Sequence, residues 1–251
     1  MYQCPQQIVY TIKQGDSLYT IAKYHKTTIE SILDMNANIN PYILQPGSKI
    51  RLCPGEEFTM EPEIPEMTHC IKCNEQLALS NDMRQAWLQH VYWTRMLIIS
   101  IVERLADAPE VANRLLENPY DIASIFGRYY SKDVADLIQK LLTEHLQIGA
   151  AIITAARDEN QEEVDRLNIM WYENADEMAD AFSSINPYYN REMVQQMLYQ
   201  HLSLLTEELN KRIMGYYNED IDAFNEGERE AMAMADYFVT GIMRQFPQDF
   251  M

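Results

Sequence analysis

From residue 82 to the end, the sequence repeats itself at an offset of about 56 residues. Asn118 returns as Asn174 and Phe126 returns as Phe182, within stretches where apolar residues recur every three to four positions. Apolar residues at that spacing line one face of an α-helix, and similarity at a fixed period is typical of chains built from one repeated unit. The sequence therefore predicts that residues 82–251 form an all-α bundle of repeated αα-hairpins.

Breaks in the apolar pattern set the expected helix boundaries. The first helix begins at Asp82 and ends before Asp107-Ala108-Pro109, because proline removes a backbone N–H and interrupts helical hydrogen bonding. No alternation of β-branched residues follows, so we expect no strand in this segment. The later helices are expected over residues 110–126, 132–157, 160–183, 190–214 and 217–244.

Three histidines occupy equivalent positions of the repeat when one gap is allowed, namely His90, His145 and His201. Imidazole is a common ligand of transition metals, and histidines on neighbouring helices would be able to converge. Nearby carboxylates would come from Glu103, Glu144 or Glu207. The repeat thus raises the hypothesis of a metal site inside the bundle.

The spacing around these histidines argues against one known kind of metal site. Di-iron helical bundles use a Glu-x-x-His pattern, with the two ligands three residues apart on one helix face. The residues three positions before the histidines here are Trp87, Leu142 and Leu198. The adjacent Glu144 and His145 project about 100° apart on a helix, so they do not easily share an ion. The sequence favours structural histidines, keeps a metal or small-molecule pocket as the alternative, and predicts no cofactor.

The net charge of −18 is divided unevenly along the chain. Residues 1–55 hold five Lys or Arg and three Asp or Glu, so the acidic excess belongs to the remainder. Nucleic-acid binding needs basic residues that neutralise phosphates, and an isoelectric point near 4.6 argues against it. No apolar run approaches the roughly 18–20 residues of a membrane span, and we see no signal-peptide pattern at the start. We expect neither a nucleic-acid partner nor a membrane span.

The first 54 residues carry a different pattern. Residues 8–13 alternate as a strand does, and the turn at Gly15-Asp16-Ser17 provides a cap for a helix that starts at Leu18. A second helix begins near Thr27, and residues 50–52 form a second strand. The order β-α-α-β predicts a small α+β domain over residues 1–54, so the chain as a whole is mostly α.

This segment contains two long motifs. They read YTIKQGDSLYTIA and SILDMNANINPYILQPGSKIRLCP. They resemble the LysM domain family, whose pattern is YTV-x-x-GD[ST]L-x-x-IA, then LL-x-x-N, NP-x-x-L-x-x-G and I-x-IP. The resemblance covers residues 8–54, with Ala37 where many members have proline. It implies binding to glycans that contain N-acetylglucosamine, such as peptidoglycan or chitin.

In LysM domains the sugar lies in a shallow groove between the loop after the first strand and the loop before the last. Backbone groups of the two turns hold N-acetyl groups, and Tyr19 or Tyr42 would lie against a sugar ring. The alternative is that residues such as Gly15 and Leu18 only build the fold. The resemblance implies a glycan-binding set of Gly15, Asp16, Ser17, Leu18, Tyr19, Asn38, Ile39, Asn40, Pro41, Tyr42 and Ile43.

Residues 55–81 are acidic, contain proline and lack an apolar period, which predicts an extended linker. Cys70 and Cys73 form a CxxC near its end, which is compatible with free thiols, a local disulfide, an intermolecular cross-link, a shared metal or redox catalysis. Cys4 and Cys53 bracket the LysM-like segment, and they are candidates for a disulfide if their Cα atoms lie within about 7 Å.

Common catalytic signatures such as GxSxG, HExxH and GxxxxGK[ST] are absent, so the sequence favours a non-enzymatic protein. The leading hypothesis is a bacterial cell-wall or spore-associated protein that binds glycan and presents its helical domain for assembly or partner binding. An external glycan target without a signal peptide fits a spore coat or cortex, since the mother cell builds these layers around the engulfed spore. The other location is cytoplasmic synthesis followed by cell-wall association.

Two alternative functions stay open. One is a metal-binding or enzymatic bundle that the LysM-like domain localises to the wall. The other is a self-assembling structural protein of the spore coat, whose Met- and Tyr-rich helices would make the contacts.

Overall fold

Two separate hydrophobic cores divide the chain into two units, Met1–Thr68 and His69–Met251. The structure is a computed structural model that describes residues 7–37, 39, 40, 44–55 and 71–250. Within these ranges, residue 30 and residues 71–74 are described by their backbone alone. Each unit is considered by itself below.

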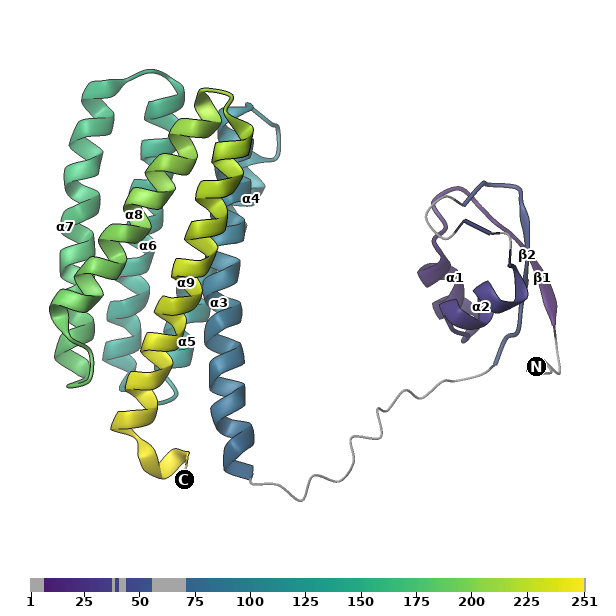
Figure 1. Ribbon diagram of the computed structural model, residues 1–251, viewed down its shortest axis with the longest axis horizontal. Coiled ribbons are helices and arrows are strands. Elements are labelled where there is room, and N and C mark those ends of the chain that lie inside the picture. The colour runs from purple at the N-terminus through teal and green to yellow at the C-terminus, as the bar shows by residue number, and fades with distance from the viewer. Residues whose placement is uncertain (1–6, 38, 41–43, 56–70, 251) are drawn as a thin grey trace. The chain divides into compact units, whose positions relative to one another are not determined.

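The N-terminal unit is a two-stranded antiparallel sheet with two helices (Figure 1). Strand β1 (Ile8–Thr11) pairs with β2 (Lys49–Leu52), so that Ile8 lies opposite Leu52. Between them lie α1 (Leu18–His25) and α2 (Ile29–Met35). The predicted order β-α-α-β is therefore confirmed.

Residues from all parts of this unit bury one small core. Burial alternates along β2 because successive strand residues point to opposite faces of the sheet. Ile32 and Leu52 are fully buried, whereas Val9 on β1 is exposed. The core consists of Ile12, Leu18, Ile21, Ala22, Ile32, Ile50 and Leu52.

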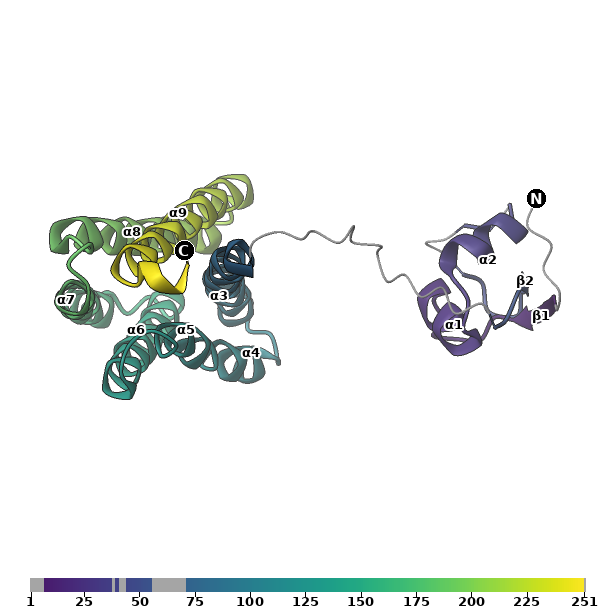
Figure 2. The same ribbon diagram turned by 90° about the horizontal axis from the view of Figure 1, so that it is seen from below.

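The C-terminal unit is all-α, as the repeat predicts. Its helices are α3 (Ile71–Val102), α4 (Ala108–Leu115), α5 (Asn118–Phe126), α6 (Lys132–Arg157), α7 (Gln161–Ile185), α8 (Arg191–Ile213) and α9 (Tyr217–Gln245), followed by a short 3₁₀ turn, η1 (Pro247–Asp249). Contacts run from α3 to α5, α6, α7, α8, α9 and back to α3, which closes a ring around one core. Figure 2 shows this arrangement along the helices, with α4 beside α3.

Three helix pairs carry the repeat: α3 with α5, α6 with α7, and α8 with α9. Phe126, Phe182 and Phe238 lie at the same position of the three second helices and are buried. Their ring centroids lie 4.5–5.7 Å apart, so the three repeats meet around one aromatic cluster. The third copy, on α9, shows that the unit is a triplication.

Two sequence expectations need correction. The expected linker over residues 55–81 is too long, because α3 begins at Ile71 and buries Leu79 and Met83 in the bundle core. The single helix expected over residues 110–126 is two helices, since Leu116 and Glu117 separate α4 from α5 and Pro119 lies in the first turn of α5. In both places tertiary packing or proline determines the helix boundary, and the local apolar spacing does not predict it.

None of the described helices is long and apolar enough to cross a lipid bilayer.

Candidate functional site

The loop after β1 is a turn held by Asp16. Its carboxylate accepts hydrogen bonds from the Lys13 backbone N–H at 2.7 Å and the Tyr10 hydroxyl at 2.9 Å. Both bonds lower the pKa of Asp16, and the bond from the Lys13 backbone has the larger effect. Gly15 beside it has φ +88°, a left-handed conformation that glycine adopts at no steric cost. Both residues therefore shape the turn in the first place.

The next three residues of the predicted glycan-binding set have separate roles. Ser17 caps α1: its hydroxyl accepts from the Thr20 backbone N–H at 3.1 Å, while the Thr20 hydroxyl accepts from the Ser17 backbone N–H. Leu18 is buried in the core. Tyr19 points its ring outward and is 62 % exposed. Of these three residues, only Tyr19 has a large exposed side chain.

The loop before β2 is described in part. Asn38, Pro41, Tyr42 and Ile43 of the predicted set lie outside the described residues. Ile39 is half-buried against the core, and Asn40 is exposed. Ile39 and Asn40 line a hollow together with Asn36, Leu44 and Arg51. From the segment after β1 the hollow includes Ile12 but none of the predicted binding residues from Gly15 to Tyr19, so the described residues do not join the two predicted sets in one groove.

Cys53 follows β2, is buried and is disulfide-bonded. Its sulfur partner lies outside the described side chains, where the other three cysteines, Cys4, Cys70 and Cys73, are found. The pairing of Cys53 with Cys4 stays a prediction.

In the C-terminal unit, the three repeat histidines come together at the centre of the helical ring. His90 lies on α3, His145 on α6 and His201 on α8, and all three are buried. One nitrogen of each ring lies within 4.8 Å of the other two. The ring centroids are 5.5–6.2 Å apart.

The second helix of each pair holds the outer nitrogen of its histidine. Asn118 Oδ1 lies 3.0 Å from His90 Nδ1, and Asn174 Oδ1 lies 3.1 Å from His145 Nδ1. The orientation of both amides is fixed, since their Nδ2 groups donate to the carbonyls of Ala86 and Leu141. An amide oxygen only accepts. His90 and His145 therefore carry their proton on Nδ1 and keep a lone pair on Nε2.

The third histidine has a different partner. Glu230 on α9 lies at the position of Asn118 and Asn174, and its Oε2 is 3.4 Å from His201 Nδ1. Glu230 is 8 % exposed, and among the described residues its carboxylate has no hydrogen-bond partner. Sequence reasoning missed Glu230, although one further step of 56 residues from Asn174 leads to it.

The carboxylates expected near the histidines lie elsewhere. Glu103 pairs with Arg212 at 2.7 Å, Glu144 lies 3.7 Å from Lys140, and Glu207 is exposed. They follow or flank the histidines in sequence, and helix geometry turns them toward the outside of the ring.

Burial sets the charge state of two of the rings. Burial lowers the pKa of His90 to about 4, with His201 as a second cause. Burial also lowers the pKa of His145 well below its ordinary value. Both imidazoles are therefore neutral at pH 7, which leaves Nε2 free to act as a metal ligand or hydrogen-bond acceptor.

A cavity of about 30 Å³ adjoins the histidine cluster. It is apolar apart from the three imidazoles, and a space of this size holds a water molecule or a ligand atom. Its lining repeats threefold as Trp87, Leu142 and Leu198 and as Ile122, Met178 and Met234.

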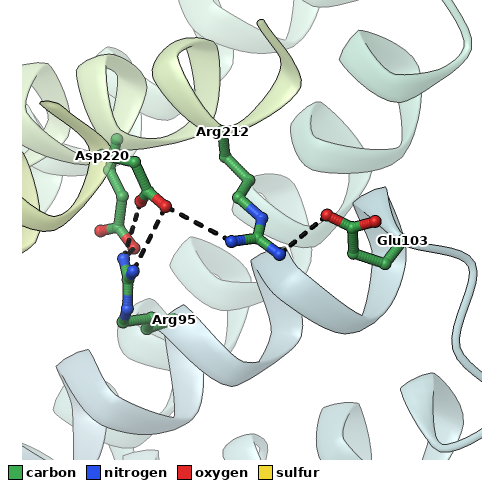
Figure 3. A network of polar contacts seen from close by, with 5 residues as sticks. Arg95, Glu103, Arg212 and Asp220 are labelled. Atoms are coloured by element: carbon green, nitrogen blue, oxygen red, sulfur yellow. Dashed lines mark hydrogen bonds and ion pairs between the residues drawn. The ribbon is translucent and has the colours of Figure 1, made fainter. Parts of the chain in front are cut away.

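A buried ion network ties α3, α8 and α9 together beside the histidines (Figure 3). Arg95 on α3 donates to Asp220 at 2.8 Å and to Glu208 at 2.6 Å. Arg212 lies 3.6 Å from Asp220 and donates to Glu103 at 2.7 Å. Burial raises the pKa of Glu208 to about 7, against the opposing effect of Arg95.

Comparisons with known proteins locate one family in the chain. Residues 10–52 match the LysM domain. No curated protein and no solved structure matches the chain. The match covers the β-α-α-β unit and confirms the resemblance inferred from its motifs. It implies binding to peptidoglycan or a related N-acetylglucosamine-containing glycan.

Proposed function

We propose that this protein is a non-enzymatic, bacterial glycan-binding protein that attaches through residues 10–52 and presents its helical unit for assembly or partner binding. The observation that supports the proposal is the LysM match over the N-terminal unit. The ligand is peptidoglycan or a chitin-like polymer. The binding residues that we propose are those predicted in the two loops, after β1 and before β2.

Within these loops the residues divide by what their side chains already do. The oxygens of Asp16 and Ser17 accept backbone hydrogen bonds, so these residues fix the turn and contribute backbone groups to the glycan. Tyr19 and Asn40 are exposed, so their side chains are the ones that we assign to direct contact with sugar. Aromatic rings supply much of the contact area of such sites with little conformational entropy to lose.

Paired tyrosine variants test this assignment. Tyr19→Ala should weaken binding of the full chain to soluble N-acetylglucosamine oligomers roughly tenfold, which corresponds to about 1.4 kcal/mol. Tyr24→Ala is the matched control, because Tyr24 is an exposed tyrosine of the same helix that lies outside the predicted loops. Isothermal titration calorimetry measures both, and Asn40→Ala should resemble Tyr19→Ala. Equal affinities for Tyr19→Ala, Asn40→Ala and Tyr24→Ala would refute the assignment.

The location that we propose for this function is the coat or cortex of a bacterial spore. The layout of a LysM domain followed by a helical unit supports it. Immunolocalisation through growth and sporulation of the source bacterium tests the location. Label confined to the vegetative wall would contradict the spore assignment and leave glycan binding intact.

A further inference from the structure

We propose that His90, His145 and His201 together bind one divalent transition-metal ion of the zinc type at the centre of the helical unit. This goes beyond glycan binding and does not depend on it. The candidate ligand nitrogens lie within 4.8 Å of one another. Nitrogens bound to one zinc ion at about 2.1 Å lie about 3.4 Å apart, so each ring needs to move by roughly 1 Å.

The donor set selects the class of metal. Three imidazoles without an oxygen ligand suit zinc, copper or nickel, whereas magnesium and calcium require oxygen ligands. Three protein ligands leave the fourth position of a tetrahedral ion for water or another small ligand. The adjoining cavity of about 30 Å³ has room for such a ligand.

The outer partners of the histidines are those of a metal site. A metal-bound histidine almost always donates its other ring N–H to a carbonyl or carboxylate oxygen, which fixes the ring and its tautomer. Asn118 and Asn174 hold Nδ1 of His90 and His145 by hydrogen bonds from the neighbouring helix, and Glu230 Oε2 lies 3.4 Å from Nδ1 of His201. Nε2 of His90 and His145 therefore remains for an ion, and an oxygen lies beside Nδ1 in each repeat.

Glu230 supplies an independent observation that points to a cation. Its side chain is more than nine-tenths buried, and neither oxygen has a hydrogen-bond partner among the described residues. Burying a carboxylate is unfavourable unless a positive charge lies close to it. Asparagine holds the same place in the other two repeats, so a neutral partner suffices to orient a histidine. At the third place the carboxylate supplies a negative charge, which would partly balance a divalent ion bound by neutral imidazoles.

The third repeat leaves more space beside its histidine than the second. Gly227 on α9 occupies the position of Leu115 and Trp171 in the other repeats. A Cβ added to Gly227 would meet no atom within 4 Å, whereas Trp171 packs on His145 with ring centroids 5.3 Å apart. A small hollow lined by Gly227, Glu208 and His201 lies at this point.

Zinc titration of the full chain tests the site. The protein is stripped with EDTA and titrated with Zn²⁺ in excess Mg²⁺, which occupies weak sites on the acidic surface. We expect one Zn²⁺ per chain, with His145→Gln and His201→Gln weakening the affinity at least a hundredfold. Glu230→Gln should weaken it about 10- to 100-fold, as loss of an outer-shell partner does. His25→Gln, in the N-terminal unit, is the matched control and should bind as the unaltered chain does.

Absence of tight Zn²⁺ binding would overturn the proposal. Binding that survives all three substitutions in the histidine cluster would place the ion elsewhere and would overturn it as well. If the variants fail to fold, X-ray absorption on the zinc-loaded unaltered chain decides. A shell with three imidazole nitrogens supports the site, and a shell of oxygens alone contradicts it.

Discussion

The two units place their candidate sites in opposite surroundings. In the N-terminal unit, the side chains assigned to glycan contact are exposed beside a small core, Tyr19 in the first turn of α1 and Asn40 in the loop before β2. In the C-terminal unit, three buried histidines come from three helices and meet at the centre of a closed ring. The first site therefore depends on local turns, whereas the second depends on the packing of the whole bundle. Changes to core, charge and caps should consequently affect the two units differently.

The largest expected effect on stability comes from the aromatic cluster, and it should be confined to the C-terminal unit. Phe238 is fully buried and contacts Phe126, Phe182 and Trp87. Phe238→Ala should lower the free energy of unfolding of the C-terminal unit by about 3–5 kcal/mol. Urea denaturation followed by circular dichroism measures the loss, and hydrogen exchange reports the N-terminal unit, which should be unchanged. Equal destabilisation of both units would show that they do not unfold separately.

The next effect concerns the ion network of Figure 3 and depends on pH. The pKa of Glu208 is raised from 4.5 to about 7 in the folded protein, so folding favours its protonated form. This preference contributes about 3 kcal/mol to the free energy of unfolding. The contribution is fully present below pH 4.5 and is lost as the pH rises through 7.

Glu208→Gln isolates this effect, because the amide does not titrate. The difference in unfolding free energy between the unaltered chain and the variant should shrink between pH 4.5 and 7. Denaturant melts at a series of pH values measure it. A difference that is constant with pH would mean that Arg95 keeps Glu208 ionised throughout.

Alanine substitutions at two glycines of α9 should change the stability by smaller amounts and in opposite directions. A Cβ at Gly241 would lie 1.9 Å from the Tyr189 ring, so Gly241→Ala should cost about 1–3 kcal/mol through overpacking. A Cβ at Gly227 meets nothing within 4 Å, so Gly227→Ala should stabilise the helix by about 0.5–1 kcal/mol. Thermal melts measure both, and a loss of stability in Gly227→Ala would contradict the open space at that position.

The smallest expected loss of stability belongs to the N-terminal unit. Ser17→Ala removes the cap of α1 and should cost about 1 kcal/mol. Because α1 is short, the loss should appear as faster amide exchange in α1, with no change in the helices of the bundle. Unaltered exchange in α1 would show that the Thr20 hydroxyl alone is enough to hold the start of this helix.

The sequence predicts most of the fold because its signals there are periodic or contiguous. The motif around Gly15-Asp16-Ser17 lies within a few residues, and the β-α-α-β order follows from it. The repeat predicts the helical pairs and the equivalence of the three histidines. The predicted start at Asp82 and the single helix predicted over residues 110–126 were wrong. The observed starts at Ile71 and Asn118 depend on core contacts and on a proline rather than on the period.

The sequence does not predict that the three histidines converge, and the reason is physical. A repeat shows that residues are equivalent, but it does not show whether their side chains face one axis or three separate interfaces. Ring closure between α3 and α9 decides this. Glu230 was missed since it replaces the asparagine of the other repeats, so identity at the repeat offset is lost there.

The proposal that the N-terminal unit binds the glycan and the helical unit does not is tested most directly by co-sedimentation with purified peptidoglycan. The full chain is compared with a chain that lacks residues 10–52, and both are checked for helical content. The account predicts that the full chain sediments with the glycan and that the shortened chain stays in the supernatant while keeping its helices. Sedimentation of the shortened chain to the same extent would contradict it, because binding would then belong to the helical unit.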